Sequence, residues 1–162
     1  MRGGRKDSYM ADVGIIRKID DIPALKKRLI AAFDRKSRSH IAISRYGLLL
    51  ARHILQLAKV KPSGAIKDCF DITRKWQAGK ARFQEARNVA FKLHRLARGE
   101  KEPVKVKVLR VMGQVAAIPH VKRHALIASD YAIKLINVMH PGGLKAVSRE
   151  RKIQIKLMKS AS

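Results

Sequence analysis

The sequence predicts an all-α fold, a single-domain bundle of about seven helices. The length of 162 residues suits one domain. Hydrophobic residues make up 46% of the chain but aromatic residues only 5%, so the core must be mostly aliphatic, as in closely packed helices. Apolar residues also recur at spacings of three and four along most of the sequence, which is the periodicity of helices with one buried face.

The first segment, residues 1–20, carries three glycines and mixed charges with weak periodicity. We predict a weakly ordered N-terminal arm there, with one short ordered piece at Val13 to Ile19. Residues 21–162 are then predicted to form the helical domain.

The first two predicted helices begin at recognisable caps. Asp21 is the expected N-cap of the first, with Pro23 in its first turn. Its apolar stripe consists of Leu25, Leu29, Ala32 and Phe33. Ser37 or Ser39 caps the second helix, which must end before Pro62. Its broad apolar face consists of Ile41, Tyr46, Leu49, Leu50, His53, Ile54 and Leu57.

The third and fourth helices have clear boundaries. Ser63 is the expected cap of the third, and Gly79 its stop. Its inward residues are Ile66, Cys69, Phe70, Thr73 and Trp76. The fourth helix has the most regular apolar stripe, and Gly99 ends it. That stripe consists of Phe83, Ala86, Ala90, Leu93 and Ala97.

The fifth segment fits two patterns. Valines alternate with lysines from Val104 to Val108, as in an amphipathic strand. A helical stripe uses more residues, places Pro103 in the first turn and avoids a strand without a partner, so we predict a helix. That stripe consists of Val104, Val108, Val111, Met112 and Val115.

Two further helices complete the bundle. Pro119 is predicted to open a helix that runs through Met139 and is broken by the Pro-Gly-Gly run at residues 141–143. A last basic helix is predicted from about Leu144 to Lys159.

Charge is the most extreme feature of the composition. Lys and Arg number 37 against 12 Asp and Glu, which gives a net charge of +25. Such a field attracts nucleic acid, an anionic membrane surface or an acidic protein. Residues 1–10 lack the apolar region of a secretory signal, and the stretch from Ala125 to Met139 is too short and polar for membrane insertion. With a single cysteine, these features predict a cytoplasmic protein.

Three candidate chemical groups have commoner structural explanations. His120 and His124 are spaced as a metal pair on one helix, but the sequence offers neither the Glu of a zinc protease nor a third ligand. Asp130 can serve a histidine in proton transfer, yet a buried ion pair with an arginine is the commoner use of such a residue. Cys69 fits a core residue better than a nucleophile. We therefore predict no catalytic residue, no metal and no cofactor, with a hydrolase of unknown type as the last alternative.

Nucleic-acid binding is the main alternative from charge alone. Arg45 with Tyr46, and Arg52 with His53, resemble base-reading positions on a recognition helix. The basic clusters lie at residues 26–28, 35–38, 74–75, 80–82, 105–110, 122–123 and 149–159. They are spread over every helix and form no single stripe, and few aromatic residues are present for stacking on bases.

Two runs carry a family resemblance. WQAGKARFQEARNVAFKLH (residues 76–94) and RVMGQVAAIPHVKRHALIASDYA (residues 110–132) resemble the putative immunity protein family of bacterial polymorphic toxin systems, immunity class five. The resemblance covers about residues 22–140, and its most specific part is Gly113 to Leu126. The motif positions on which it rests most are Trp76, His94, Gly113, His120, His124 and Tyr131.

The resemblance implies an all-helical protein, here at residues 21–162, that neutralises a cognate protein toxin by binding it and uses no cofactor. The six motif positions then have a structural or partner-binding role. Independently of the family, Gly113 and nearby alanines would let the helices on either side of Pro119 approach closely. His120 and His124 would lie at that junction and bond carbonyls left free by the turn.

Overall fold

The computed structural model describes residues 19–162, which form seven helices and contain no strand. The all-helical bundle predicted from the sequence is therefore confirmed. The helices are α2 (Pro23–Lys36), α3 (His40–Ala58), α4 (Gly64–Gln77), α5 (Phe83–Gly99), α6 (Pro103–Ala117), α7 (His124–Met139) and α8 (Leu144–Ser160). Except for Ile19 and Asp20, the predicted N-terminal arm and its ordered piece lie outside the described residues.

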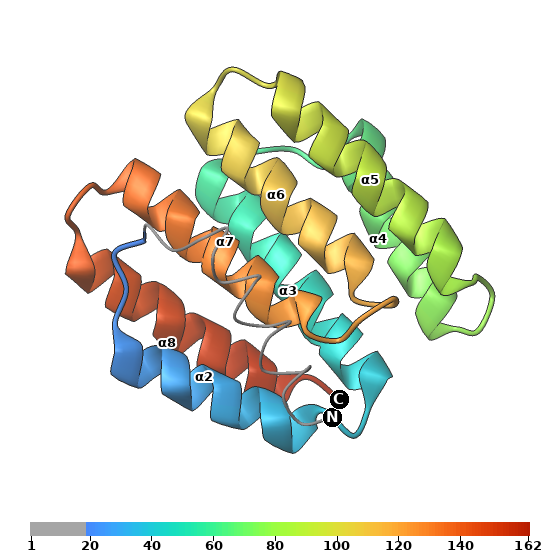
Figure 1. The fold of residues 1–162 in the computed structure, drawn as a ribbon, viewed down its shortest axis with the longest axis horizontal. Helices are drawn as coiled ribbons and strands as arrows, with labels where there is room; N and C mark the ends of the chain where they lie inside the picture. The colour runs from blue at the N-terminus through green and yellow to red at the C-terminus, as the bar shows by residue number, and fades with distance from the viewer. Residues whose placement is uncertain (1–18) are drawn as a thin grey trace, which may run out of the picture.

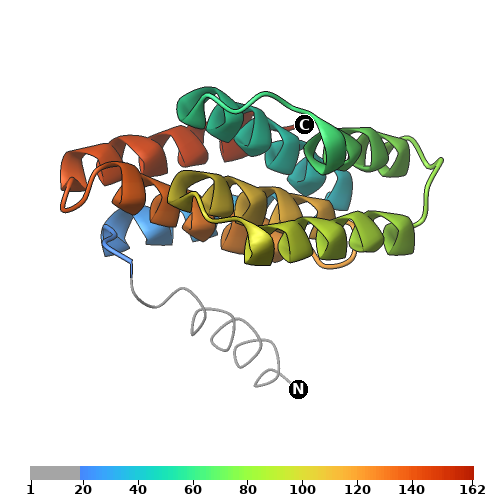
Figure 2. The same cartoon turned by 90° about the horizontal axis from the view of Figure 1, so that it is seen from above.

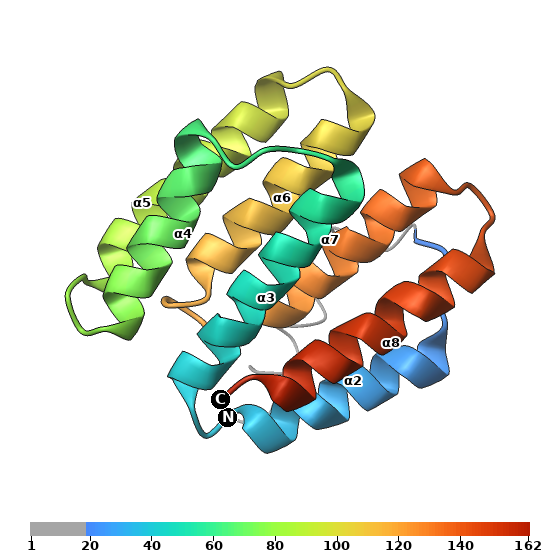
Figure 3. The same cartoon turned by 180° about the vertical axis from the view of Figure 1, so that it is seen from behind.

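The helices lie in two layers. Figure 1 shows the layer of α2, α7, α6 and α5 toward the viewer, and Figure 3 shows the layer of α8, α3 and α4 from behind. Figure 2 shows the same two layers edge-on. Helix α3 packs on α6 and α7 across the layers and on α4 and α8 within its own, so it lies at the centre of the bundle. The first and last described helices, α2 and α8, pack side by side. No helix within residues 19–162 combines the length and apolar character needed to cross a bilayer.

The helix starts follow the predicted capping chemistry only in part, since Ser63 lies at the N-cap of α4 but its side chain makes no cap hydrogen bond. Ser39 caps α3, since its hydroxyl accepts the N–H of Ala42 at 3.0 Å. Pro23 lies in the first turn of α2, as predicted, but the N-cap is Ile22 and not Asp21. The reason is that the Asp21 carboxylate is committed elsewhere, to an arginine of α8 described below.

Helix α6 settles the ambiguous fifth segment as a helix. It begins at Pro103, and the Glu102 carboxylate accepts the N–H groups of Val104 and Lys105 at 3.2 and 2.7 Å. The prediction that Pro119 opens the next helix is wrong, because α7 begins at His124. The N–H groups of residues 120 and 121 both bond to the carbonyl of Ala117, so this segment forms the turn that closes α6.

Small residues line the core between α5, α6 and α7. The alanines of the α5 stripe, Ala86, Ala90 and Ala97, are buried, and so are Ala116, Ala117, Ala125, Ala128 and Ala132 around the α6–α7 turn. Side chains this small let neighbouring helices pack closely, which explains how a core with few aromatic residues is filled.

A buried ionic network joins α2, α7 and α8. Arg151 is fully buried, and its guanidinium bonds to both carboxylate oxygens of Asp21 at 2.6 and 3.0 Å and to Asp130 at 2.6 Å. Lys26 adds an ion pair to Asp130 at 3.1 Å. Burial alone would lower the pKa of Arg151, but the two carboxylates outweigh it and raise the pKa further above its ordinary value. Arg151 thus belongs to the core, although the sequence places it in a basic surface cluster.

Hydrogen bonds extend this network toward the centre of the bundle. Glu150 accepts a hydrogen bond from His53 at 2.6 Å and another from Gln154 at 3.2 Å. The Ser129 hydroxyl donates to the Ala125 carbonyl, so the buried Tyr46 hydroxyl must donate to Ser129. Polar groups of α3, α7 and α8 are therefore satisfied by one another in the core.

Candidate functional site

The structure brings four of the six motif positions together and leaves two apart. His94 lies against Gly113 and close to His124, and Tyr131 lies near Arg110, which bonds to His94, so the four positions gather where α5, α6 and α7 meet. Trp76 lies at the end of α4, and His120 lies in the turn after α6. With Arg110 and Gln114, which the motif analysis did not single out, the four gathered residues form what we name the histidine cluster.

His94 is fixed by a glycine and an arginine of α6. A Cβ atom on Gly113 would lie 2.6 Å from Cε1 of the His94 ring, so only glycine leaves room for this ring. Arg110 donates a hydrogen bond to Nδ1 of His94 at 2.9 Å. Because arginine can only donate, the proton of the neutral imidazole lies on Nε2. Burial, followed by the charges of Arg110 and His124, lowers the pKa of His94 to about 4.

The structure thus corrects the predicted role of Gly113, because a different helix uses the space beside it. We expected this glycine to let α6 approach α7, but the atoms that need the space belong to His94 of α5. The α6–α7 approach relies instead on the buried alanines around the turn.

The prediction that His120 and His124 share one helix is wrong, because α7 starts only at His124. Nδ1 of His124 bonds to the side-chain oxygen of Gln114 at 2.6 Å. His120 is exposed, and its ring packs against Phe83 with the ring centres 5.3 Å apart. The two imidazoles therefore have different surroundings, and neither has the spacing of a metal pair on one helix face.

A histidine that the sequence analysis missed holds the end of α6. His40, the first residue of α3, bonds through Nε2 to the carbonyl of Ile118 at 2.6 Å. Trp76 packs edge-on against the His40 ring, with the ring centres 4.8 Å apart. The carbonyl bond that we expected from His120 or His124 is therefore made by His40, and Trp76 supports it.

The other candidate chemical groups are used by the fold. Asp130 pairs with Arg151 and Lys26, which confirms the ion pair favoured for it. Cys69 is fully buried, and burial raises the pKa of its thiol to about 12, far from a reactive thiolate. Among residues 19–162, no three His, Cys, Asp or Glu side chains are placed to hold a metal ion.

The four residues of α3 that resembled a recognition helix do not form a common exposed surface. Tyr46 is fully buried and His53 is bonded to Glu150, so neither can reach a base edge. Arg45 bonds to the carbonyl oxygen of Ser162. Of the four residues, only Arg52 is exposed without a hydrogen bond within the described chain.

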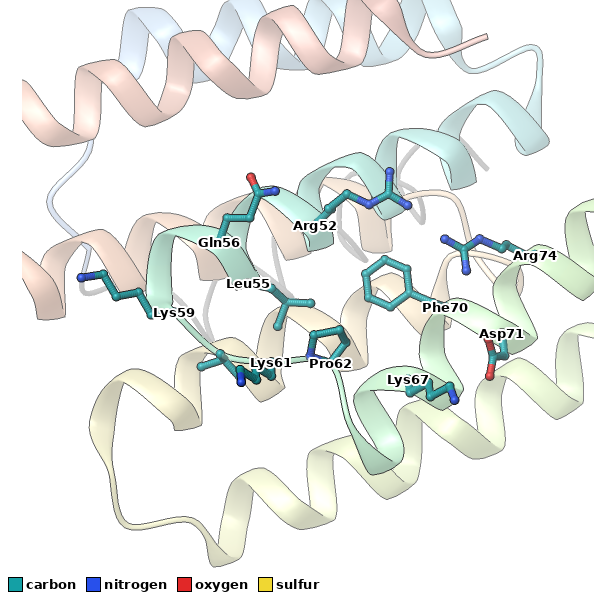
Figure 4. A pocket seen from close by; sticks show the side chains of 11 residues that line it. Arg52, Leu55, Gln56, Lys59, Lys61, Pro62, Lys67, Phe70, Asp71 and Arg74 are labelled. Atoms are coloured by element: carbon teal, nitrogen blue, oxygen red, sulfur yellow. The ribbon is translucent and has the colours of Figure 1, made fainter.

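Arg52 instead lines a groove between the end of α3 and α4, shown in Figure 4. The groove has a volume of about 730 Å³. We name it the α3–α4 groove, and it is lined by Arg52, Leu55, Gln56, Lys59, Val60, Lys61, Pro62, Lys67, Phe70, Asp71 and Arg74. The sequence analysis did not find it, and its only signal was the run Lys-Val-Lys-Pro at residues 59–62.

The fold and the site define a basic helical protein whose motif residues mainly contact other residues of the same chain. Residues 35–161 match the protein family described as Imm-5 like putative immunity protein. The match covers most of the chain, so the chain belongs to this family and the resemblance found in the sequence is confirmed. Compared with the predicted span of about residues 22–140, the match begins later, at residue 35, and extends past residue 140 to include α8. No curated protein and no solved structure matches the chain.

Proposed function

We propose that this protein neutralises a cognate protein toxin by binding it, without catalysing a reaction. The observation that carries the proposal is the family match over residues 35–161. Supporting it, two of the three motif histidines are hydrogen-bonded within the fold, His94 with Arg110 and His124 with Gln114, and His40 bonds to a backbone carbonyl. Side chains that hold the scaffold suit a protein that acts by presenting a stable surface.

Co-expression tests this function. The chain is produced in a bacterial host together with the toxin domain encoded beside its gene. We expect growth to be restored and the two proteins to elute as one complex in size-exclusion chromatography. An unrelated basic helical protein at equal abundance serves as the control. Persistent killing without a complex would contradict the proposal.

Nucleic-acid binding remains a second candidate, and one feature of α5 favours it. Phe83 and Phe91 are exposed at 37% and 50%, and Arg87 lies between them with its guanidinium 5.0 Å from the Phe91 ring centre. Exposed aromatic rings beside arginines are the arrangement that stacks on single-stranded bases.

The second candidate predicts binding of a single-stranded oligonucleotide that weakens steeply as salt rises. Phe91→Ala should then cost about 1–3 kcal/mol of binding free energy, the usual contribution of one stacked base. Equal affinity of Phe91→Ala and the wild type, or no binding at low salt, would contradict it.

A further inference from the structure

The α3–α4 groove exists because the chain cannot continue α3 into α4. Lys59 ends α3 in the left-handed conformation, with φ of 56°. Pro62 then restricts the residue before it to an extended conformation. Gly64, with φ of +53°, starts α4 in a new direction. Helix α4 makes its broader contacts with α5 and α6, so its other side and the end of α3 are left as the walls of an open groove.

The floor of the groove is apolar and its rim is cationic. Leu55 and Phe70 are only 5% and 7% exposed, and Val60 and Pro62 extend this apolar surface. The rim carries five cations against the single acid Asp71. Those cations are Arg52, Lys59, Lys61, Lys67 and Arg74. The volume of about 730 Å³ lies within the range of roughly 300–1,000 Å³ common for ligand pockets.

Two arginines frame one end of the groove. Figure 4 shows Arg52 reaching from α3 and Arg74 from α4 toward each other, beside the ring of Phe70. Their guanidinium carbons lie 6.0 and 5.5 Å from the centre of the Phe70 ring. Within residues 19–162, neither guanidinium is paired with a carboxylate, since Asp71 forms no ion pair there. Both guanidinium groups are therefore held near an apolar surface, and their N–H donors are available to a partner.

We propose that the α3–α4 groove binds an acidic protein segment that carries one hydrophobic anchor. Carboxylates of the segment bond to Arg52 and Arg74, and the anchor side chain packs on the apolar surface of Leu55, Val60 and Pro62. The assignment of this segment to the toxin rests on the proposed function. Charge complementarity also accounts for the positive rim, which would repel a basic partner.

A protein segment fits this groove better than nucleic acid does. A phosphate backbone offers anions but no apolar side chain for the floor. Phe70 is covered by two arginines and only 7% exposed, so its face cannot stack on a base. The groove therefore differs from the exposed rings of Phe83 and Phe91 on α5.

A peptide probe tests the groove without the toxin. The probe is a short fluorescein-labelled peptide in which glutamates flank a central leucine, titrated with the full chain at physiological ionic strength. One matched peptide replaces the glutamates with glutamines, and another replaces the leucine with serine. The groove variant is Arg52→Gln/Arg74→Gln. The control variant, Arg28→Gln/Arg35→Gln, removes two exposed cations of α2 and lowers the net charge equally.

We expect the groove variant to bind the probe about tenfold more weakly than the control variant, because two charge-assisted bonds are lost. Both matched peptides should also bind more weakly than the probe. Equal losses in the two variants would overturn the proposal, because the binding would then depend on the overall charge. Displacement of the probe by an equally charged oligonucleotide, with the same dependence on Arg52 and Arg74, would assign the groove to nucleic acid and also overturn it.

Circular dichroism of both variants establishes that they are folded. Gln56→Glu provides a second test of the groove. This substitution adds a negative charge at an exposed lining position and should weaken the probe severalfold. Unchanged affinity of Gln56→Glu, together with unchanged affinity of the double variant, would overturn the proposal.

The co-expressed toxin separates the two hypotheses. If the wild type neutralises the toxin and the groove variant binds it as tightly as the control variant, the groove proposal is wrong and the proposed function stands. If the groove binds the probe as expected but no complex with the toxin forms, the proposed function is wrong and the chemistry of the groove stands.

Discussion

The charged residues between α2 and α8 are buried and paired, whereas those around the α3–α4 groove are exposed and nearly all positive. Arg151 is fully buried between Asp21 and Asp130. Arg52 and Arg74 lie on Phe70 and have no carboxylate partner in the described chain. The net charge of +25 therefore combines arginines that hold the fold with arginines available to a partner. Substitutions in the two regions should have opposite consequences for stability and for binding.

The largest effect is expected for Arg151→Met. Removing the guanidinium leaves Asp130, whose side chain is 2% exposed, with Lys26 as its one remaining cationic partner among residues 19–162. Removing one partner of a buried ion pair lowers the free energy of unfolding by about 3–5 kcal/mol. Urea denaturation measures this loss. The control is Arg149→Met, an exposed residue of the same helix, for which we expect a change within about 0.5 kcal/mol. Similar losses for the two variants would show that the buried network does not stabilise the fold.

The next effect concerns the packing of α5 on α6. Gly113→Ala places a Cβ 2.6 Å from the His94 ring and should cost about 1–3 kcal/mol as the ring is displaced. The double variant Gly113→Ala/His94→Ala should recover part of this cost, because the clashing ring is absent. Gly99→Ala is the control, since no atom lies within 4 Å of its added Cβ. Additive losses in the double variant would contradict the contact.

A smaller effect is expected in the pH dependence of stability, through the titration of His94 in the histidine cluster. The pKa of His94 falls from 6.5 to about 4 on folding, so between these pH values the unfolded chain binds this proton more readily. Its stabilising contribution is complete above pH 6.5 and is lost as the pH falls toward 4. Because solvent screens a partly exposed ring, we expect a contribution of about 1 kcal/mol. In His94→Gln, the decrease in stability between pH 6.5 and pH 5 should be shallower than in the wild type, as measured by urea denaturation. Parallel curves would contradict the lowered pKa.

The smallest effect on stability is expected at the groove. Arg52→Gln/Arg74→Gln removes two exposed cation–π contacts but also relieves repulsion in a chain of charge +25. We expect the free energy of unfolding to change by less than about 0.5 kcal/mol. A loss comparable to that of Arg151→Met would mean that these arginines belong to the scaffold, and the contrast between the two regions would fail.

The helices could be predicted because each depends on residues close in sequence. Of the five residues in the predicted α5 stripe, Ala86, Ala90, Leu93 and Ala97 are buried, whereas Phe83, the first residue of the helix, is 37% exposed. Ser39 and Pro23 mark helix starts for reasons that act within one turn. The start of α7 was misplaced because Pro119 is compatible both with a helix start and with the turn that closes α6.

The candidate sites depend on contacts that no local pattern encodes. Asp21 and Arg151 are separated by 130 positions, and His40 meets Ile118 across 78. Sequence alone gave no reason to treat Arg151 differently from the exposed lysines around it. The α3–α4 groove arises from the relative direction of two helices. In the sequence only Pro62 hints at that change of direction, because the left-handed conformation of Lys59 is visible only in the structure.

Hydrogen–deuterium exchange of the full chain, with and without the co-expressed toxin domain, tests the division between the two regions most directly. The account predicts that toxin binding slows exchange at the end of α3, in the segment at residues 59–63 and in α4, and leaves α2 and α8 unchanged. Protection concentrated on α2 and α8, with none around the groove, would contradict it.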